Sequence, residues 1–140
     1  MQQTILIFIF TVGVAQAFST QSYGVEGKIH CDNRPASGVI VHLVDQDTFS
    51  ADDIMADGET GSEGSFRLSG HTSELGTINP ELHVYHRCGD PKSREHDCPA
   101  VYKIELPRQL VTKGEVPKNV YHVDTVNLRY DAKATRYCLD

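Results

Sequence analysis

The chain alternates between apolar and polar residues over several short segments, and the first of these is residues 25–31. Val25, Ile29 and Cys31 fall on one face of this segment, and charged or polar residues lie between them. Because successive side chains of a β-strand point to opposite faces, this period of two predicts a half-buried strand whose cysteine lies on the apolar face. The polar residues before it, 18–23, are expected to form a loose leader.

Residues 31–47 carry the strongest strand signal. Turn-forming residues, DNRP at 32–35 and Ser37-Gly38, lead into the apolar, β-branched run VIVHLV at 39–44. Proline presets one backbone dihedral, and β-branched residues fit a pleated, half-buried surface. Because both faces of the run are apolar, we expect a central strand covered on both sides. A short buried helix is the alternative, which the β-branching and the flanking Pro and Gly disfavour.

Further apolar segments bounded by turn residues are typical of short strands. They are residues 54–55, 66–70, 81–88, 101–106 and 121–130, the last as one strand or a bent pair. About seven short strands, with turns at regular spacing and little helical periodicity, predict an all-β fold, an antiparallel sandwich of two sheets.

The first residues predict a secretory signal. Residues 5–14 form an apolar block that is followed by Ala15-Gln16-Ala17, an A-x-A cleavage pattern. The block is shorter than the roughly 20 apolar residues that span a bilayer. We therefore expect a signal peptide at residues 1–17, one domain at residues 18–140, and a secreted protein.

Four cysteines follow the expected cleavage site, and an even number in a small secreted chain predicts disulfides with three possible pairings. We favour Cys88–Cys98, which would close a polar loop, together with Cys31–Cys138, which would tie the tail to an early strand. A zinc site is the alternative. The chain has no CxxC pattern, however, and an oxidising compartment favours bridges.

The charged residues suggest two loop sites. The net charge of −6 and the lack of a basic stripe disfavour nucleic acid as a partner. Residues 45–63 contain seven acidic residues and neither Lys nor Arg. Because Ca²⁺ prefers carboxylate oxygens, Asp52, Asp53 and Asp57 are candidate ligands, although the spacing does not match an EF-hand. A solvated acidic rim is the alternative, and no other cofactor is indicated.

A basic cluster, Arg87, Lys92 and Arg94, lies in and beside the loop between two cysteines. Arginine binds phosphate through paired donors, and a loop closed by a disulfide loses little entropy on binding. With the acidic loop, the cluster matches the phosphate, carboxylate and amine of a phosphatidylserine headgroup. An ordinary surface of mixed charge is the alternative.

The histidines and the missing motifs argue against catalysis. His86 shares its strand face with apolar residues, as does His42, so both are expected to be hydrogen-bonded core histidines rather than ligands or bases. The sequence has no Gly-x-Ser-x-Gly nucleophile elbow. We expect a protein with no catalytic residues.

Several segments occur in a recognisable series. These are VEGKIHC (25–31), PASGVIVHL (35–43), Asp52-Asp53, GSFRLSG (64–70) and NPELHVYHRC (79–88), which Cys98 follows. In their order and spacing they resemble the nematode transthyretin-like family of small secreted proteins. The resemblance implies a transthyretin-like (prealbumin-like) β-sandwich, secreted, without known catalysis.

The resemblance also implies partners. Some members look like extracellular adaptors that bind phosphatidylserine exposed on dying cells and present it to a phagocyte receptor. We therefore expect an anionic phospholipid and a receptor ectodomain as partners, with only peripheral membrane contact, and a monomer or homodimer. Alternatives are a carrier of a small hydrophobic ligand, as the name-giving transthyretins are, or a secreted effector that binds other proteins.

One enzyme shares the transthyretin fold, a hydrolase of a purine-breakdown product that is marked by a terminal Tyr-Arg-Gly-Ser. This chain ends in RYCLD at residues 136–140, which departs from that signature. The resemblance therefore does not imply that activity here.

Overall fold

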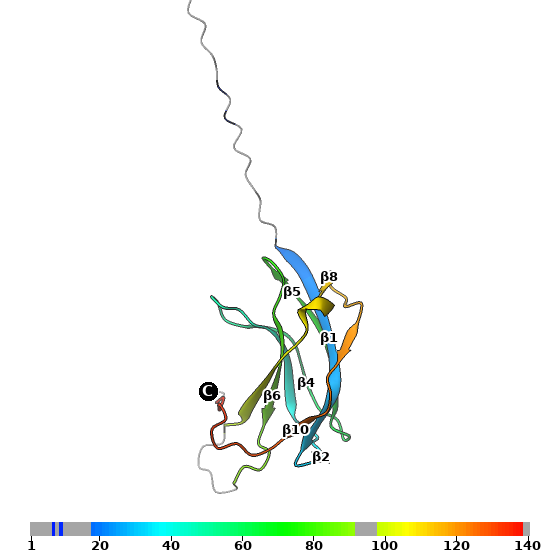
Figure 1. Cartoon of the computed structure of the whole chain (residues 1–140), viewed down its shortest axis with the longest axis vertical. Helices are drawn as coiled ribbons and strands as arrows, with labels where there is room; N and C mark the ends of the chain where they lie inside the picture. Colours follow the sequence, from blue (N-terminus) through cyan, green and yellow to red (C-terminus); the bar gives the residue numbers. More distant parts are fainter. Residues whose placement is uncertain (1–6, 8, 10–17, 92–97, 139–140) are drawn as a thin grey trace, which may run out of the picture.

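Two β-sheets face each other in the computed structural model of the chain, which describes residues 7, 9, 18–91 and 98–138 (Figure 1). The smaller sheet has the strand order β4-β3-β6-β7, and its neighbours pair antiparallel. Its strands are β3 (Ile40–Asp45), β4 (Asp53–Glu59), β6 (Pro80–His86) and β7 (Ala100–Glu105). The predicted all-β, two-sheet sandwich is confirmed.

The larger sheet is built around one long strand, β1 (Ser19–Cys31). One edge of β1 pairs antiparallel with β5 and β2, and its other edge pairs with β8, β9 and β10, the last two in parallel. The partners are β2 (Arg34–Pro35), β5 (Ser65–Glu74), β8 (Thr112–Lys113), β9 (Val120–His122) and β10 (Val126–Leu128). The segment at 121–130 is therefore the bent pair, and a 3-10 turn, η1 (Arg108–Leu110), precedes β8.

The start of β1 corrects the prediction of a loose leader at residues 18–23. Tyr23 is fully buried, and its hydroxyl donates a hydrogen bond to the carbonyl oxygen of Pro107 at 2.9 Å. Gln21 is also buried, and its Oε1 accepts the backbone N–H of Ile78 at 3.1 Å. The polar sequence was misleading because these polar groups bond inside the protein instead of to water.

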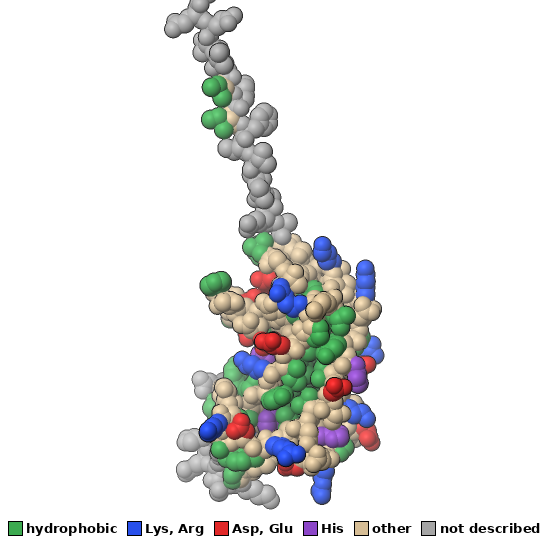
Figure 2. All heavy atoms as spheres, viewed as in Figure 1, with side chains coloured by type: hydrophobic (Ala, Val, Ile, Leu, Met, Phe, Trp, Pro, Cys, Tyr) green, Lys and Arg blue, Asp and Glu red, His purple; other side chains and the backbone are tan. Residues whose placement is uncertain are grey.

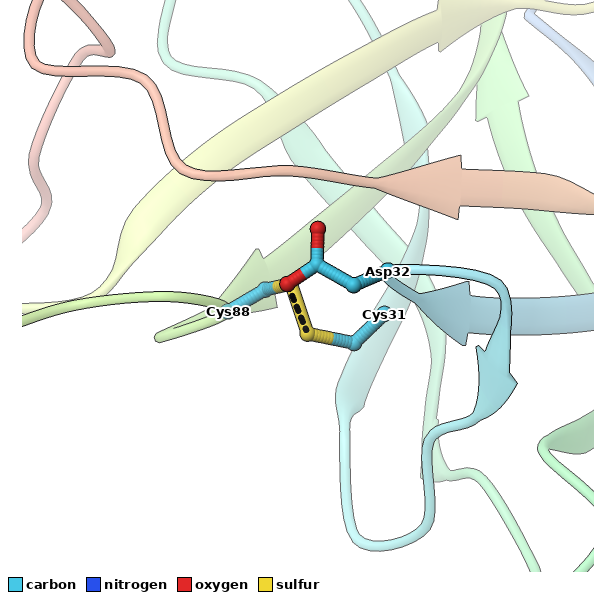
Figure 3. A group of neighbouring side chains, drawn as sticks. All are labelled: Cys31, Asp32 and Cys88. Carbon is cyan, nitrogen blue, oxygen red and sulfur yellow. Dashed lines mark hydrogen bonds between the residues drawn. A yellow bond between two sulfur atoms is a disulfide. The ribbon is translucent and has the colours of Figure 1, made fainter.

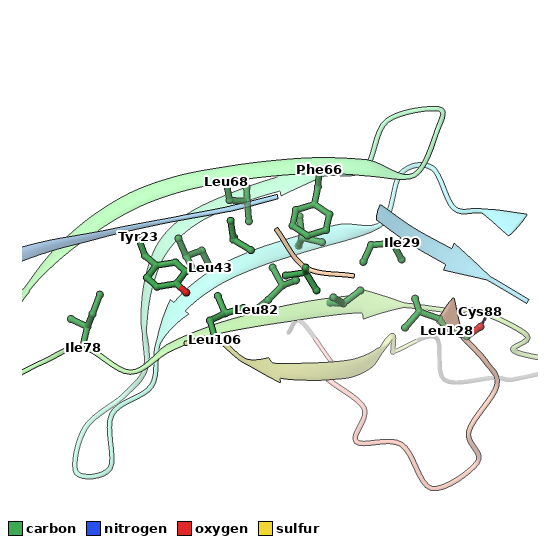
Figure 4. Close-up of a cluster of buried hydrophobic side chains, with 14 residues drawn as sticks. Tyr23, Ile29, Leu43, Phe66, Leu68, Ile78, Leu82, Cys88, Leu106 and Leu128 are labelled. Carbon is green, nitrogen blue, oxygen red and sulfur yellow. Dashed lines mark hydrogen bonds between the residues drawn. The ribbon is translucent and has the colours of Figure 1, made fainter. Parts of the chain in front are cut away.

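The core lies between the sheets and takes side chains from both (Figure 4). The largest buried apolar side chains include Tyr23, Ile29, Leu43, Ile78 and Leu82. β3 is an inner strand, as predicted, and its Leu43 points into this core. The expected cover on both faces of β3 is only partly found, because Val44 is buried on the outer face while Ile40 is 41% exposed.

Both disulfides differ from the favoured pairing, although all four cysteines are bridged. The bonds are Cys31–Cys88 and Cys98–Cys138. Cys31 ends β1 and Cys88 follows β6, so the first bond joins the two sheets, with the Cα atoms 5.7 Å apart. The favoured pairing was wrong because strand packing, not loop length, brings these residues together.

The second bond follows from where the tail lies. The tail runs antiparallel to the start of β7, with Ala100 opposite Arg136 and the Tyr137 N–H donating to the Pro99 carbonyl oxygen at 3.0 Å. Cys138 is therefore carried to Cys98 and not to β1.

The zinc alternative does not hold at the first bridge. Figure 3 shows the carboxylate of Asp32 beside the bond between Cys31 and Cys88, with an oxygen 4.0 Å from the Cys31 sulfur. Zinc binds the thiolate form, and two sulfur atoms bonded to each other are not thiolates.

Among the described residues, no helix has the length and apolar character needed to span a bilayer.

Candidate functional site

Four carboxylate groups converge at one end of the sandwich, at the top of Figure 1, where β5 ends. Asp45 is the last residue of β3, Asp53 is the first of β4 and Glu74 is the last of β5. Asp47 lies in the loop between β3 and β4. One oxygen from each residue lies within 4.8 Å of the oxygens from the other three. These four residues are called the acidic cluster below.

The acidic cluster is held by the loop that precedes β6. Oδ1 of Asp45 accepts the backbone N–H of Asn79 at 2.8 Å, and the Asn79 carbonyl oxygen accepts the N–H of Gln46 at 2.9 Å. Burial raises the pKa of Asp45, and the charges of Asp47 and Asp53 raise it further. The pKa of Glu74 is also raised, first by burial and then by the neighbouring carboxylates. Four acidic groups therefore repel one another at this position.

The structure only partly assembles the calcium ligands that the sequence suggested. Asp53 belongs to the acidic cluster, whereas Asp52 accepts the backbone N–H of Asp47 at 3.1 Å and so shapes the loop. Asp57 is placed elsewhere, opposite His42 in the β3–β4 pairing. Sequence reasoning missed Glu74, which has no local signal because it reaches the cluster only through the packing of β5 beside β4.

The opposite end of the sandwich has a surface pocket of about 400 Å³, called the edge pocket below. It lies between β7 of the smaller sheet and β10 of the larger one, near the bottom of Figure 1. Its lining includes Val101, Val126 and the buried Leu128, together with the exposed Arg129 and Asp131. Figure 2 shows apolar side chains at the surface across the middle of the drawn face, with charged side chains around them.

Buried polar contacts fix the wall of the edge pocket. His86 lines it, and its Nδ1 accepts the backbone N–H of Cys88 at 3.2 Å. Burial lowers the pKa of His86, with the charge of Asp90 opposing this effect. The predicted hydrogen-bonded core histidine is confirmed at His86. The same prediction for His42 is not met at its Nδ1, because that atom is buried without a hydrogen-bond partner among the described residues.

An ion pair ties the tail to the same end of the molecule. The guanidinium of Arg136 donates to both carboxylate oxygens of Asp90, at 2.6 and 2.8 Å. The two side chains are 20% and 17% exposed, so water screens them only partly. Hydrogen bonding to Asp90 raises the pKa of Arg136. The ion pair and the Cys98–Cys138 disulfide therefore hold the tail in place at this end of the molecule.

The basic cluster that the sequence suggested is only partly seen. Arg87 is exposed and directly follows His86 of the pocket wall. Lys92 and Arg94 lie outside the described residues. The pocket's own charged residues, Arg129 and Asp131, had been missed because a charged turn after a short strand has no distinguishing sequence signal.

Comparison with known proteins assigns the family. A sequence model described as the Transthyretin-like family matches residues 26–107. The chain belongs to the transthyretin-like family. Transthyretin-like protein 5 of Caenorhabditis elegans is 37% identical over 129 residues, which are 91% of this chain and 91% of that protein. Transthyretin-like protein 33 of the same organism is 37% identical over 135 residues, covering 95% and 92%.

The family is the one that the sequence motifs of this transthyretin-like chain resemble. The names of its two relatives above describe no enzyme. Its family and its two disulfides are consistent with a secreted protein. Among solved structures, a 9R-lipoxygenase from Cyanothece aligns with a TM-score of 0.45 and 16% identity, over 96% of this chain and 20% of the enzyme. That similarity is too low to support an argument about the transthyretin-like chain.

Proposed function

We propose that this transthyretin-like protein is a secreted, non-enzymatic adaptor that binds phosphatidylserine exposed on dying cells and bridges it to the ectodomain of a phagocyte receptor. The proposed lipid contact is the edge pocket, and the bridging role is the one that the family resemblance implies for some members. Such a protein needs an exposed site for a charged headgroup and no reactive centre.

The observation that carries the proposal is the chemistry of the edge pocket. It combines an exposed cation, Arg129, and an exposed anion, Asp131, with apolar side chains such as Leu128. A phosphatidylserine headgroup carries phosphate and carboxylate groups, which match a guanidinium, and an amine, which matches a carboxylate. The apolar lining suits the hydrocarbon next to the headgroup.

The rigidity of this end supports binding. The bond between Cys31 and Cys88 joins β1 to the segment after β6, and β1 pairs with β10 over residues 29–31. Both walls of the edge pocket are therefore fixed before any ligand arrives. A preorganised site loses less conformational entropy on binding, so a few polar contacts suffice for useful affinity.

Vesicle sedimentation tests the proposal. The disulfide-intact protein is mixed with phosphatidylcholine vesicles that contain or lack phosphatidylserine, in the presence of a chelator. We expect sedimentation only with phosphatidylserine and at least about a tenfold loss of affinity in Arg129→Ser, since a charged hydrogen bond contributes about 1.5–3 kcal/mol. Arg67→Ser is the matched control, because Arg67 is 70% exposed on β5.

Two results would contradict the proposal. If the wild-type protein does not sediment with phosphatidylserine vesicles, the lipid is wrong. If Arg129→Ser and Arg67→Ser bind as the wild type does, the lipid contact lies outside the edge pocket.

A carrier of a small hydrophobic ligand is the second candidate, and the size of the edge pocket favours it. Its volume of about 400 Å³ falls within the range of about 300–1,000 Å³ that is typical of small-molecule sites. A carrier would bind a neutral apolar fluorescent probe in this pocket, and Arg129→Ser would leave that affinity unchanged. Probe binding of this kind without vesicle sedimentation would replace the adaptor proposal.

A further inference from the structure

One carboxylate of the acidic cluster is buried and incompletely bonded. Asp45 is 1% exposed, and its Oδ1 accepts the Asn79 N–H at 2.8 Å. Its Oδ2 is also buried and receives no hydrogen bond from an N–H or hydroxyl group of the described residues. The Glu74 carboxyl lies within hydrogen-bonding reach of Asp45, but two ionised carboxylates have no proton to share. Leaving a buried charged oxygen without a partner is costly, and native proteins almost always supply one. The groups around this oxygen indicate what kind of partner it has.

The surroundings of this oxygen are negative. Asp47, Asp53 and Glu74 each bring one carboxylate oxygen to within 4.8 Å of an oxygen of Asp45 and of one another. In the described part of the chain, no Lys, Arg or His forms an ion pair with any member of the cluster. Two explanations are available for carboxylates at such distances, namely shared protons or a bridging cation.

A shared proton joins at most two of the four groups, such as Asp45 and Glu74, whereas the spacing of all four fits a single cation. Ca²⁺ binds oxygen ligands at about 2.3–2.6 Å, so two oxygens on one ion can be at most about 5 Å apart. The limit of 4.8 Å within the cluster satisfies this condition for every pair. A surface pocket of about 220 Å³ also opens onto Asp45, Asp47 and Glu74, and it gives an ion and its water ligands access from solvent.

We propose that Asp45, Asp47, Asp53 and Glu74 bind one Ca²⁺ ion. The ion supplies the missing partner of the Asp45 Oδ2 and neutralises the repulsion among the four carboxylates. Oxygen-only ligands suit Ca²⁺ better than zinc, which prefers nitrogen and sulfur. The pocket also exposes the hydroxyl-bearing residues Thr48 and Ser50, which can complete the ligand set directly or through water.

This site differs from the one that the sequence suggested and is separate from the edge pocket. Of the residues predicted from the acidic run, only Asp53 is a ligand. The ion would join the loop after β3, the start of β4 and the end of β5, which come from distant parts of the chain. Calcium binding at this site can therefore be tested independently of lipid binding.

Calorimetry with the metal alone tests the proposal. The disulfide-intact chain is freed of metal with a chelator and titrated with CaCl₂ to about 10 mM, above the dissociation constants of about 10⁻⁴–10⁻³ M found in extracellular calcium modules. We expect one ion per chain and a rise in melting temperature with Ca²⁺. Glu74→Gln and Asp53→Asn should each weaken binding at least about tenfold, since each removes a charged ligand.

Matched controls separate a built site from general acidity. Asp57→Asn removes the same charge from the same strand but outside the cluster, and it should bind Ca²⁺ as the wild type does. Without metal, Asp45→Asn should melt at a higher temperature than the wild type because it relieves repulsion, and Ca²⁺ should then raise its melting temperature less.

Three results would overturn the assignment. The first is neither heat nor a change in melting temperature up to the highest Ca²⁺ concentration. The second is an equal loss of affinity in Asp57→Asn and Glu74→Gln, which would indicate diffuse attraction. The third is Mg²⁺ binding as tightly as Ca²⁺, which would contradict the identity of the ion.

Discussion

Removing the disulfide between the sheets should be far more damaging than removing the one in the tail. The double variant Cys31→Ala/Cys88→Ala opens a link between residues separated by 57 positions. In the chain-entropy description, a loop of that length makes the bond worth about 4 kcal/mol of unfolding free energy. A domain of this size has only about 5–15 kcal/mol in total, so this bond supplies at least about a quarter of its stability.

The tail disulfide closes a loop of similar length and provides the internal comparison. Cys98 and Cys138 are separated by 40 positions, for which the same description also gives about 4 kcal/mol. The two bonds differ in their surroundings: Cys88 belongs to the core, whereas Cys138 is exposed. Losing the tail bond can therefore release the tail locally while both sheets persist, and its global cost should be much lower.

Urea unfolding followed by far-UV circular dichroism measures both costs. We expect Cys31→Ala/Cys88→Ala to lose about 4 kcal/mol, on the order of 15 °C in melting temperature, and Cys98→Ala/Cys138→Ala to lose less than half of that. Mapping of disulfide-linked peptides from the wild type should first recover the two observed pairs. Equal losses in the two variants, or a loss below about 1 kcal/mol in the first, would refute the reasoning.

The remaining predictions concern three single residues. Gly64 has φ +72° and an added Cβ would clash with the Ile29 carbonyl oxygen, so Gly64→Ala should lower the urea midpoint by the equivalent of about 2 kcal/mol or more. Tyr23→Phe removes the bond to Pro107 and should cost about 1 kcal/mol in the same assay. Burial raises the pKa of Tyr23 to about 12, so the wild type should lose stability between pH 10 and 12, and Tyr23→Phe should lose less. Because burial lowers the pKa of His86 in the folded state, its contribution to stability is present above pH 6.5 and is lost on acidification, and an NMR titration of its ring should have a midpoint below 6.5.

The pattern of the strands was readable because it is local. Alternation at residues 25–31 and the β-branched run at 39–44 each specify a strand and the face that it buries. The same kind of reasoning failed at residues 18–23, where Gln21 and Tyr23 are polar or amphipathic but bond inside the protein. Periodicity identifies apolar faces, and it has no signal for a polar group whose partner lies far along the chain.

The candidate sites could likewise be predicted only in part from the sequence. An acidic run is visible in the sequence, and of the three candidates named from it Asp53 lies in the acidic cluster. Asp45 and Asp47 also belong to the run, but the sequence does not show that they converge while Asp57 faces a different part of the sheet. Glu74 lies outside the run because it arrives from β5. The edge pocket had no sequence signal at all, since it is the space between two strands that never pair.

The sequence by itself therefore determined most of the strands and their core-facing sides, the family and the presence of disulfides, because each depends on neighbouring residues or on matching motifs. Tertiary structure alone decided which cysteines are joined, which carboxylates converge and where a pocket opens. The physical reason is that side chains meet through the stacking of two sheets, and the register and packing of those sheets depend on all the strands at once.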